Sequence, residues 1–392
     1  MNFYWLYLII PCVLYFIRPI KQNKLLFLYW MLLVILSYDN VTDFYYYYEE
    51  FFFYKNGEIG EFTERGREPF WILLNKVWNF TDYGVVIIHV LVMIVVVYCF
   101  SVFSKKLNII NASIFLFFLF NYTWKHDNIV RQDIAIILGT ISIFEILKDD
   151  LWTTRRYLKI FLLTIVGIGF HYSAFMLFPI YFFIRWISNV KLNLTVVAGI
   201  VAVFVIVCQN EMIQELLKNL GFIFILIGGD YGTHYAKQFI NLEMEANGTI
   251  GIFLSFFSLT PLIYYKIFNK KAYQTNKVIR TCVNLSWIFV IWKNNLNLDL
   301  FTRPAEYLSW FSLWGFAFML NDIMMNFHKR FNVIALSLCF AYLVCSGWSL
   351  HNFINRYYGD NNYMTILTRE CYQLKIYQRD RSSIADGYKR YR

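Results

Sequence analysis

Apolar runs recur from the first residues to about residue 348, and they constrain the fold more than any other feature. A backbone in lipid must satisfy its own hydrogen bonds, so each run that crosses a membrane must be a helix. Only 16% of the residues are charged, whereas soluble domains have about a quarter. The sequence therefore predicts an all-α polytopic membrane protein with about twelve transmembrane helices, at residues 3–18, 24–38, 84–103, 107–122, 130–148, 157–170, 172–187, 192–208, 249–267, 280–293, 305–325 and 331–348.

The lysines and arginines predict the orientation of these helices. If the loop after the first span is cytoplasmic, alternation places 18 of the 36 basic residues in cytoplasmic loops, against 10 in the outer loops. The segment 266–280 alone has five basic residues and no acidic residue. We therefore expect a single transmembrane domain over residues 1–348, with outer loops at about 39–83 and 209–248 and a basic C-terminal tail over 349–392.

The net charge of +10 does not indicate nucleic acid, because the basic residues lie between apolar runs, where they set topology and contact anionic lipid. The seven cysteines form no CxxC pair, and no group of acidic residues has a metal-ligand spacing. Motifs of metalloproteases, P-loop enzymes and serine hydrolases are absent from the sequence. We expect neither a metal nor a cofactor. The apolar piece 212–227, which two charged residues interrupt, is either a re-entrant or an interfacial helix.

Charged groups at the outer ends of the predicted spans are the candidate functional residues, because a charge at membrane depth is costly unless it faces protein or water. In NIVRQDIAIILG, Arg131 opens a span and is either an interfacial arginine or an anion clamp suited to phosphate. In NLDLFTRPAEYLSW, the sequence predicts Pro304 in a first helical turn. Arg303 would then lie at the start of that helix, with Glu306 and Tyr307 one turn later, where Arg303 either pairs with Glu306 or binds an anion.

The segment 39–68 precedes another predicted helix start and carries eight carboxylates against three basic residues. Its last part, ERGREP, is either a solvated charge cluster or the place of a general base whose protonation the arginines control. The carboxylates that we consider for this base are Glu68, Glu64 and Asp43. Arg65 and Arg67 are candidate substrate-binding residues in the same segment.

His171 lies in the middle of an apolar run over residues 157–186, within GIGFHYSAFMLFPI. Basic residues on the cytoplasmic side flank this run at both ends, so the run must cross to the outer side and return, with its turn near His171. Each half of about fourteen residues spans roughly 21 Å, less than the ~30 Å apolar core of a bilayer. His171 is then either a structural histidine or the floor of a cavity that opens outward.

These motifs, taken in order, resemble the EpsG family of Wzy-like bacterial polysaccharide polymerases. The resemblance covers about residues 38–320, and Pro304 directly after Arg303 departs from the family pattern. It rests on the acidic, tyrosine-rich segment 38–47, the helix start at 64–74, NIVRQDIA, FHYSA, Tyr231 and Tyr235 in a tyrosine-rich outer loop, and the pair Arg303 and Tyr307.

The resemblance implies a glycosyltransferase with a GT-C-like fold in the bacterial cytoplasmic membrane, with its active site on the outer face. Such enzymes join oligosaccharide units carried on undecaprenyl diphosphate, and they work beside a flippase and a chain-length regulator. Arg131 and Arg303 would stabilise the diphosphate, a carboxylate would be the base, and His171 would contact the diphosphate or a hydroxyl. Asp43, Glu64, Arg65, Arg67, Tyr235, Lys237 and Tyr307 would bind substrate. The alternatives are a lipid-linked oligosaccharide flippase and another GT-C transferase or ligase.

Overall fold

A computed structural model of the chain describes residues 3–17, 24–36, 47, 50, 51, 54, 68–119, 130–148, 153–209, 215, 249–295 and 299–326. Every regular element within these ranges is a helix, which confirms the predicted all-α class. The predicted span 331–348, the tail 349–392 and nearly all of the predicted piece 212–227 lie outside the described residues.

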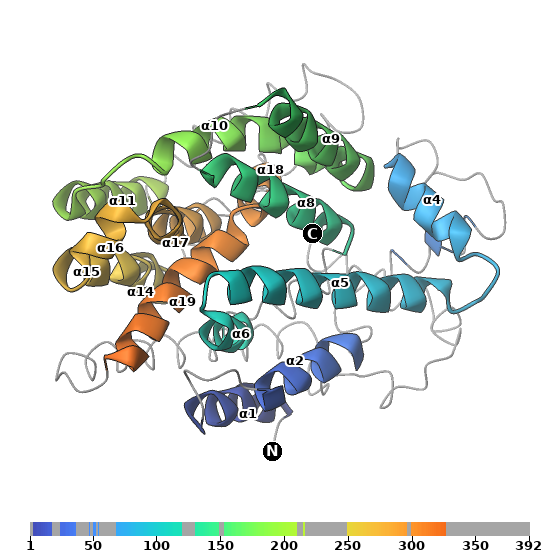
Figure 1. Cartoon of the computed structure of the whole chain (residues 1–392), viewed down its shortest axis with the longest axis horizontal. Coiled ribbons are helices and arrows are strands. Elements are labelled where there is room, and N and C mark those ends of the chain that lie inside the picture. The colour runs from blue at the N-terminus through green and yellow to red at the C-terminus, as the bar shows by residue number, and fades with distance from the viewer. Residues whose placement is uncertain are drawn as a thin grey trace.

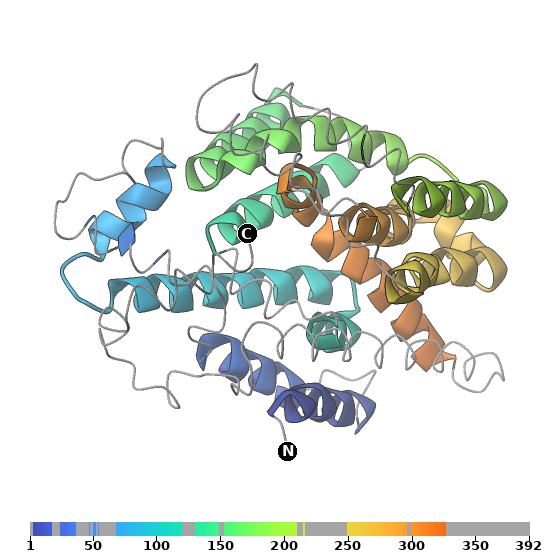
Figure 2. The same cartoon turned by 180° about the vertical axis from the view of Figure 1, so that it is seen from behind.

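The helices of the first third agree with the apolar runs. Figures 1 and 2 show α5 crossing the middle of the molecule, with α1 and α2 along one side and α9 and α10 along the other. The α5 helix ends in a Schellman motif, in which Ile109 N–H donates to Ser104 O at 3.0 Å and Asn108 takes a left-handed φ of 59°. The bounds are α1 Phe3–Ile17, α2 Lys24–Leu36, α4 Pro69–Val77, α5 Gly84–Lys106, α6 Ile110–Leu119 and α8 Val130–Leu147.

The apolar run over residues 157–186 turns at the predicted position. Helix α9 (Thr154–Phe170) ends before His171, and a 3-10 turn, η1 (Tyr172–Met176), leads into α10 (Leu177–Ile187) and then α11 (Leu194–Gln209). His171 has an extended backbone, with φ −156° and ψ 119°, so it separates the two helical segments. The turn leaves His171 buried, whereas Tyr172 and Phe175 are exposed.

The last part of the described chain contains one helix break that the sequence did not predict and one that was predicted at the wrong position. The predicted span 249–267 is two helices, α14 (Thr249–Phe257) and α15 (Thr260–Ile267), because Pro261 begins a new helix. The predicted helix start at Pro304 is also wrong, since Pro304 lies inside α18 (Asp299–Glu306). Pro304 lacks the N–H that would donate one turn earlier in α18. Helix α18 ends two residues after Pro304, and α19 (Ser309–Met325) follows after a short turn. Between α15 and α18 lie α16 (Lys270–Thr275) and α17 (Lys277–Asn295).

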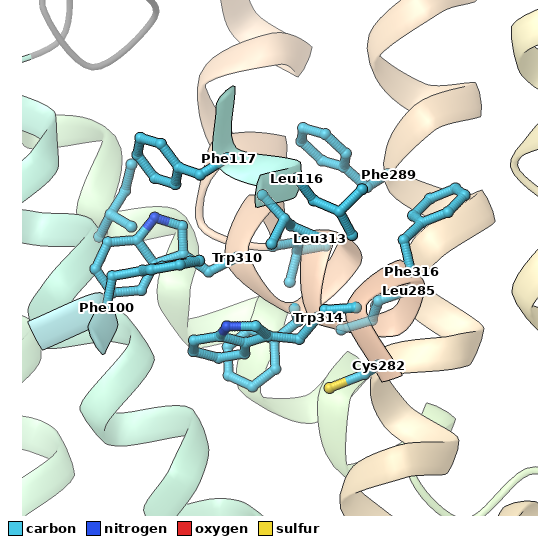
Figure 3. Packing of buried hydrophobic residues seen from close by; sticks show 14 of the residues in the cluster. Phe100, Leu116, Phe117, Cys282, Leu285, Phe289, Trp310, Leu313, Trp314 and Phe316 are labelled. Carbon is cyan, nitrogen blue, oxygen red and sulfur yellow. The ribbon is translucent and has the colours of Figure 1, made fainter. Parts of the chain in front are cut away.

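Aromatic rings fill the core between α5, α6 and α19 (Figure 3). The ring of Phe100 lies 5.2 Å from Trp310, 5.7 Å from Trp314 and 5.0 Å from Phe117, centroid to centroid. The indole N–H of Trp314 donates to Ser104 Oγ at 2.9 Å, so its polar atom is also satisfied. Tight packing and internal hydrogen bonds of this kind hold helices together in lipid, where excluding water contributes little.

Helices α17 and α19 approach closely because Gly315 has no side chain. A Cβ atom there would lie 2.4 Å from the carbonyl oxygen of Cys282 on α17, far inside van der Waals contact. Ser312 Oγ donates to Ser286 O at 3.2 Å across the same interface. Small residues at a helix interface allow the backbones to approach in this way.

Polar contacts tie the helix ends together at one end of the bundle. Arg280 donates from Nε to Ser188 O at 2.6 Å and from Nη1 to Gln274 O at 2.8 Å, which satisfies carbonyl groups at the ends of α10 and α16. Asn269 Nδ2 donates to Asp322 Oδ2 at 2.8 Å.

Helix α5 is long and apolar enough to cross a membrane, and it is the one such helix within the described ranges. Shorter apolar helices cover residues 24–33, 172–187, 194–206 and 253–267. Helices α9, α10 and α11 present large apolar side chains to the outside, such as Phe161, Phe182 and Val203. Apolar faces of this kind mark contact with lipid or with another protein. The count of twelve spans and the GT-C-like architecture stay predictions.

Candidate functional site

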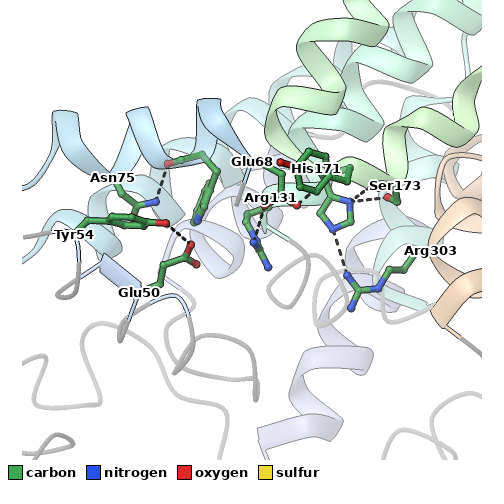
Figure 4. A network of polar contacts seen from close by, with 10 residues as sticks. Glu50, Tyr54, Glu68, Asn75, Arg131, His171, Ser173 and Arg303 are labelled. Carbon is green, nitrogen blue, oxygen red and sulfur yellow. Dashed lines mark hydrogen bonds and ion pairs between the residues drawn. The ribbon is translucent and has the colours of Figure 1, made fainter. Parts of the chain in front are cut away.

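Four of the residues singled out in the sequence meet where α8 begins and α9 ends (Figure 4). Arg131 Nη1 lies 3.0 Å from Glu68 Oε2, and Arg303 Nη1 lies 3.4 Å from His171 Nε2. The backbone N–H of Tyr172 donates to Glu68 Oε1 at 3.4 Å, which links the two pairs. We call Glu68, Arg131, His171 and Arg303 the charged cluster.

Glu68 owes its position to the proline that follows it. A residue before proline is restricted to extended backbone, and Glu68 has φ −62° and ψ 124°. Pro69 then begins α4, and the Glu68 side chain reaches Arg131 instead of capping its own helix. Helix α4 lies close to α9 because Gly169 has no side chain, since a Cβ there would be 2.2 Å from the ring of Phe70. The close approach brings Glu68 beside the turn at His171.

Arg303 is placed by α8 as well as by its own helix. Gln132 Nε2 donates to the backbone oxygen of Arg303 at 2.7 Å, so the residue after Arg131 holds the backbone of the second arginine. The two arginines are 172 residues apart in sequence, and this hydrogen bond links their helices. The cluster therefore gathers two permanent positive charges from separate helices around one imidazole.

The contacts of His171 indicate which ring nitrogen carries the proton. A guanidinium group can only donate, so its approach requires Nε2 without a proton, and the proton then lies on Nδ1. Nδ1 is 2.6 Å from Ser173 Oγ, which can accept that proton. The backbone N–H of Ser173 also lies 3.3 Å from Nδ1, and a hydrogen bond there would require the opposite tautomer. We assign the proton to Nδ1 because Arg303 can only donate to Nε2, whereas Ser173 Oγ can accept from Nδ1.

His171 lies in the turn between α9 and η1, and its surroundings keep the ring neutral. Burial contributes most, and the positive charges of Arg131 and Arg303 add to it, so the pKa of His171 is well below its ordinary value. A neutral ring with an unprotonated Nε2 can accept a hydrogen bond or a proton.

Tyr307 lies behind the cluster, in the short turn between α18 and α19. Its hydroxyl is 3.0 Å from Ser173 Oγ, and its side chain is fully buried. The row His171, Ser173 and Tyr307 is thus connected by hydrogen bonds, and Tyr307 reaches the cluster through Ser173. Its predicted role in substrate binding stays a prediction.

An aromatic pair that the sequence analysis did not connect with Arg131 surrounds its guanidinium group. The Cζ atom of Arg131 lies 5.4 Å from the ring centroid of Tyr47 and 6.0 Å from that of Trp71. The two rings are 5.4 Å apart. Trp71 follows Glu68 by three residues, and this spacing was the one available signal that both face Arg131. In a chain with 21% aromatic residues such a signal does not stand out.

Figure 4 also shows Glu50, Tyr54 and Asn75, which lie beyond Arg131 on the side away from His171. Tyr54 Oη donates to Glu50 Oε1 at 3.4 Å, and Glu50 is buried. Asn75, one helical turn after Trp71, donates from Nδ2 to Trp71 O at 2.9 Å. Glu50 also contributes electrostatic attraction to Arg131. The site thus continues from the charged cluster toward α4.

The remaining predicted site residues lie outside the described residues: Asp43, Glu64, Arg65, Arg67, Tyr235 and Lys237. Within the described ranges, no group of three or more His, Cys, Asp or Glu side chains gathers as metal ligands would. Metal independence stays a prediction.

The sequence model of the EpsG family matches residues 22–363, which is most of the chain. No curated protein and no solved structure matches at a significant level. The matched range includes all four members of the charged cluster, and the family fits a membrane protein of polysaccharide biosynthesis. The chain therefore belongs to the EpsG family, which indicates a polysaccharide polymerase-like role.

Proposed function

We propose that the protein joins oligosaccharide units carried on undecaprenyl diphosphate into a surface polysaccharide, at the outer face of the bacterial cytoplasmic membrane. One observation carries the proposal: two arginines, a neutral histidine and a carboxylate come together from four separate elements. Charges buried in this way need a functional or structural reason, and a structural ion pair alone does not account for a second arginine beside a histidine.

The arginines suit the leaving group of this reaction. When the bond between the sugar and the lipid diphosphate breaks, negative charge develops on a phosphate oxygen. Arg131 and Arg303 are permanently charged and offer N–H donors that are already in place, so they would stabilise this charge without a metal ion. In the protein alone, the Glu68 carboxylate occupies one donor of Arg131, where it stands in for a phosphate oxygen.

The exchange of Glu68 for a phosphate group on Arg131 would supply the base that activates the acceptor sugar. A diphosphate bound to Arg131 would displace Glu68 Oε2, and the released carboxylate would take the proton from the attacking hydroxyl of the acceptor sugar. The new glycosidic bond forms as the bond to the diphosphate breaks, and the diphosphate leaves with the electron pair. His171 Nε2 would orient the hydroxyl or contact the diphosphate once Arg303 turns to the phosphate.

The finer features of the proposal follow from the same resemblance. We infer about twelve membrane-spanning helices in a GT-C-like arrangement, no cofactor, and contact with a flippase, a chain-length regulator and membrane lipid. Asp43, Glu64, Arg65, Arg67, Tyr235, Lys237 and Tyr307 would line the path of the sugar chains.

The test uses purified protein and lipid-linked repeat units in vesicles. A ladder of polymer products supports the polymerase, translocation of units without new bonds supports a flippase, and a single transfer supports another transferase or ligase. Arg131→Ala and Arg303→Ala should each abolish the ladder at normal protein levels, and persistent long polymer in either variant would refute the role of the arginines.

The same assay identifies the base. Glu68→Gln keeps the size and one acceptor oxygen of the side chain but removes its basicity, so we expect a loss of kcat of about 10²–10⁴-fold. His171→Gln keeps a hydrogen-bonding group and should retain more activity than Glu68→Gln. The reverse order would assign the base to His171.

A further inference from the structure

The guanidinium group of Arg131 is enclosed by aromatic rings as well as by a carboxylate. Tyr47 and Trp71 lie 5.4 Å and 6.0 Å from its Cζ atom, and both rings are buried. Tyr47 precedes α4 in the sequence and Trp71 lies on α4, so two separate segments supply the rings. The contacts bring the π-electron faces of these side chains within the range of a cation–π interaction.

These rings attract Arg131 in a way that Glu68 cannot. A carboxylate holds an arginine through its N–H donors, and the same donors must bind the diphosphate during the reaction. A cation–π contact attracts the charge of the guanidinium group and uses no donor. The Trp71 indole can therefore hold Arg131 before, during and after the exchange of Glu68 for a phosphate group, whereas Tyr47 also forms a side-chain hydrogen bond with Arg131 and so occupies one of its donors.

Simple core packing is the competing explanation for Trp71. Its side chain is 1% exposed, and a large aromatic side chain often fills space between helices. Core packing depends on the shape of the ring, however, whereas a cation–π contact depends on the electron density of its face. Fluorine atoms on the indole reduce that density and change the shape little, so they separate the two explanations.

We propose that Trp71 and Tyr47 are positioning residues that fix the guanidinium group of Arg131 for the diphosphate. The inference rests on the proposed function, because it assumes that Arg131 binds this group. It extends the site to residues that contact neither the diphosphate nor the reacting atoms. Trp71 has the larger ring and the stronger π face, so it should contribute more than Tyr47.

The experiment places tryptophan with one, two or three fluorine atoms at position 71 of the full-length protein in vesicles. The measured quantities are kcat and KM for the lipid-linked repeat unit, together with the melting temperature. We expect kcat/KM to fall in steps, by about tenfold in total for three fluorine atoms, while the melting temperature falls by no more than about 2 °C, the size expected for the loss of one cation–π contact. Trp71→Phe should fall between the wild type and Trp71→Leu.

The matched control places the same fluorinated residues at Trp30. Its side chain is fully buried against other rings, with its centroid 5.0 Å from Phe117 and 5.6 Å from Phe100. Fluorination there should leave kcat/KM unchanged. A fall at both positions would show a general effect of fluorine and would overturn the inference.

The outcomes for Arg131 separate the two proposals. If Arg131→Ala abolishes the product ladder and fluorination of Trp71 has no effect on kcat/KM, the positioning role is refuted and the proposed function stands. If Arg131→Ala leaves the ladder intact, the proposed role of Arg131 fails, and the positioning role fails with it. A stepwise loss in the fluorinated series, combined with an inactive Arg131→Ala variant, supports both.

Discussion

The ion pair between Arg131 and Glu68 should be measurable as a coupling between two substitutions. Its atoms are 3.0 Å apart, and the side chains are 19% and 8% exposed. Removing one partner of a buried pair costs about 3–5 kcal/mol, because the other charge stays buried without compensation. Arg131 is partly reached by solvent, so we expect the lower end for Glu68→Ala, about 3 kcal/mol.

The Arg131→Ala variant should be destabilised by slightly more, because it also loses its contacts with Tyr47 and Trp71. For a partly buried arginine, cation–π contacts contribute about 0.5–2 kcal/mol to the free energy of unfolding. In the double variant neither member of the pair stays behind without the other, so its cost should be smaller than the sum of the single costs. We expect a coupling free energy of about 2 kcal/mol.

The assay is denaturant titration of the four proteins in detergent micelles. Unfolding can be followed by a thiol-reactive dye that reaches Cys282, which is fully buried in the folded protein. The control is Lys148→Ala, because the pair between Lys148 and Glu145 has a lysine side chain that is 51% exposed. That substitution should cost less than about 1 kcal/mol.

Two results would refute the reasoning. Costs of Glu68→Ala and Arg131→Ala that add within about 0.5 kcal/mol would show that the two side chains do not interact in the folded protein. A cost for Lys148→Ala as large as that for Glu68→Ala would show that burial does not decide the strength of these pairs.

Three further predictions concern the helix interfaces and the pH response. Gly315→Ala should destabilise the protein by about 1–3 kcal/mol, because its Cβ would lie 2.4 Å from Cys282 O. Gly199 has open space around it, so Gly199→Ala should not destabilise the protein. Equal melting temperatures of the two variants would contradict this. Arg280→Ala should cost about 1–3 kcal/mol, because it removes donors from Ser188 O and Gln274 O, and Arg280→Lys should recover part of the loss. The pKa of His171 is lowered in the folded protein, so its contribution to stability is complete above about pH 6.5 and is lost as the pH falls toward the folded pKa. The His171→Gln protein should therefore lose less stability than the wild type between pH 7 and 5, and identical pH profiles would refute this.

The sequence predicted helices well where an apolar run has clear boundaries. The run that became α5 begins at Gly84 and ends at Lys105 and Lys106, so its length and type could be read directly. The break before α15 was missed, because it lies inside an apolar run. The break after α18 was misplaced, because Pro304 was taken to begin a helix. Proline marks such breaks only approximately, and tertiary packing decides which turn it occupies.

The charged cluster was predictable in its members and not in its contacts. Arg131, His171, Arg303 and Glu68 stand out because polar residues are rare near apolar spans, and topology placed them on one side. The pairing of Arg131 with Glu68 and of Arg303 with His171 depends on how α4, α8, α9 and α18 pack, which no local pattern encodes. Ser173 and Trp71 were missed as partners for the same reason.

The turn at His171 has a consequence for how a lipid-borne substrate would be divided between two environments. His171 is buried, yet its neighbours in the same turn, Tyr172 and Phe175, are 40% and 64% exposed. One turn of backbone therefore separates the apolar exterior from the charged cluster. A polyprenyl chain would then stay among the membrane lipids beside Phe175 while its diphosphate reaches the arginines, with only the turn at His171 between them.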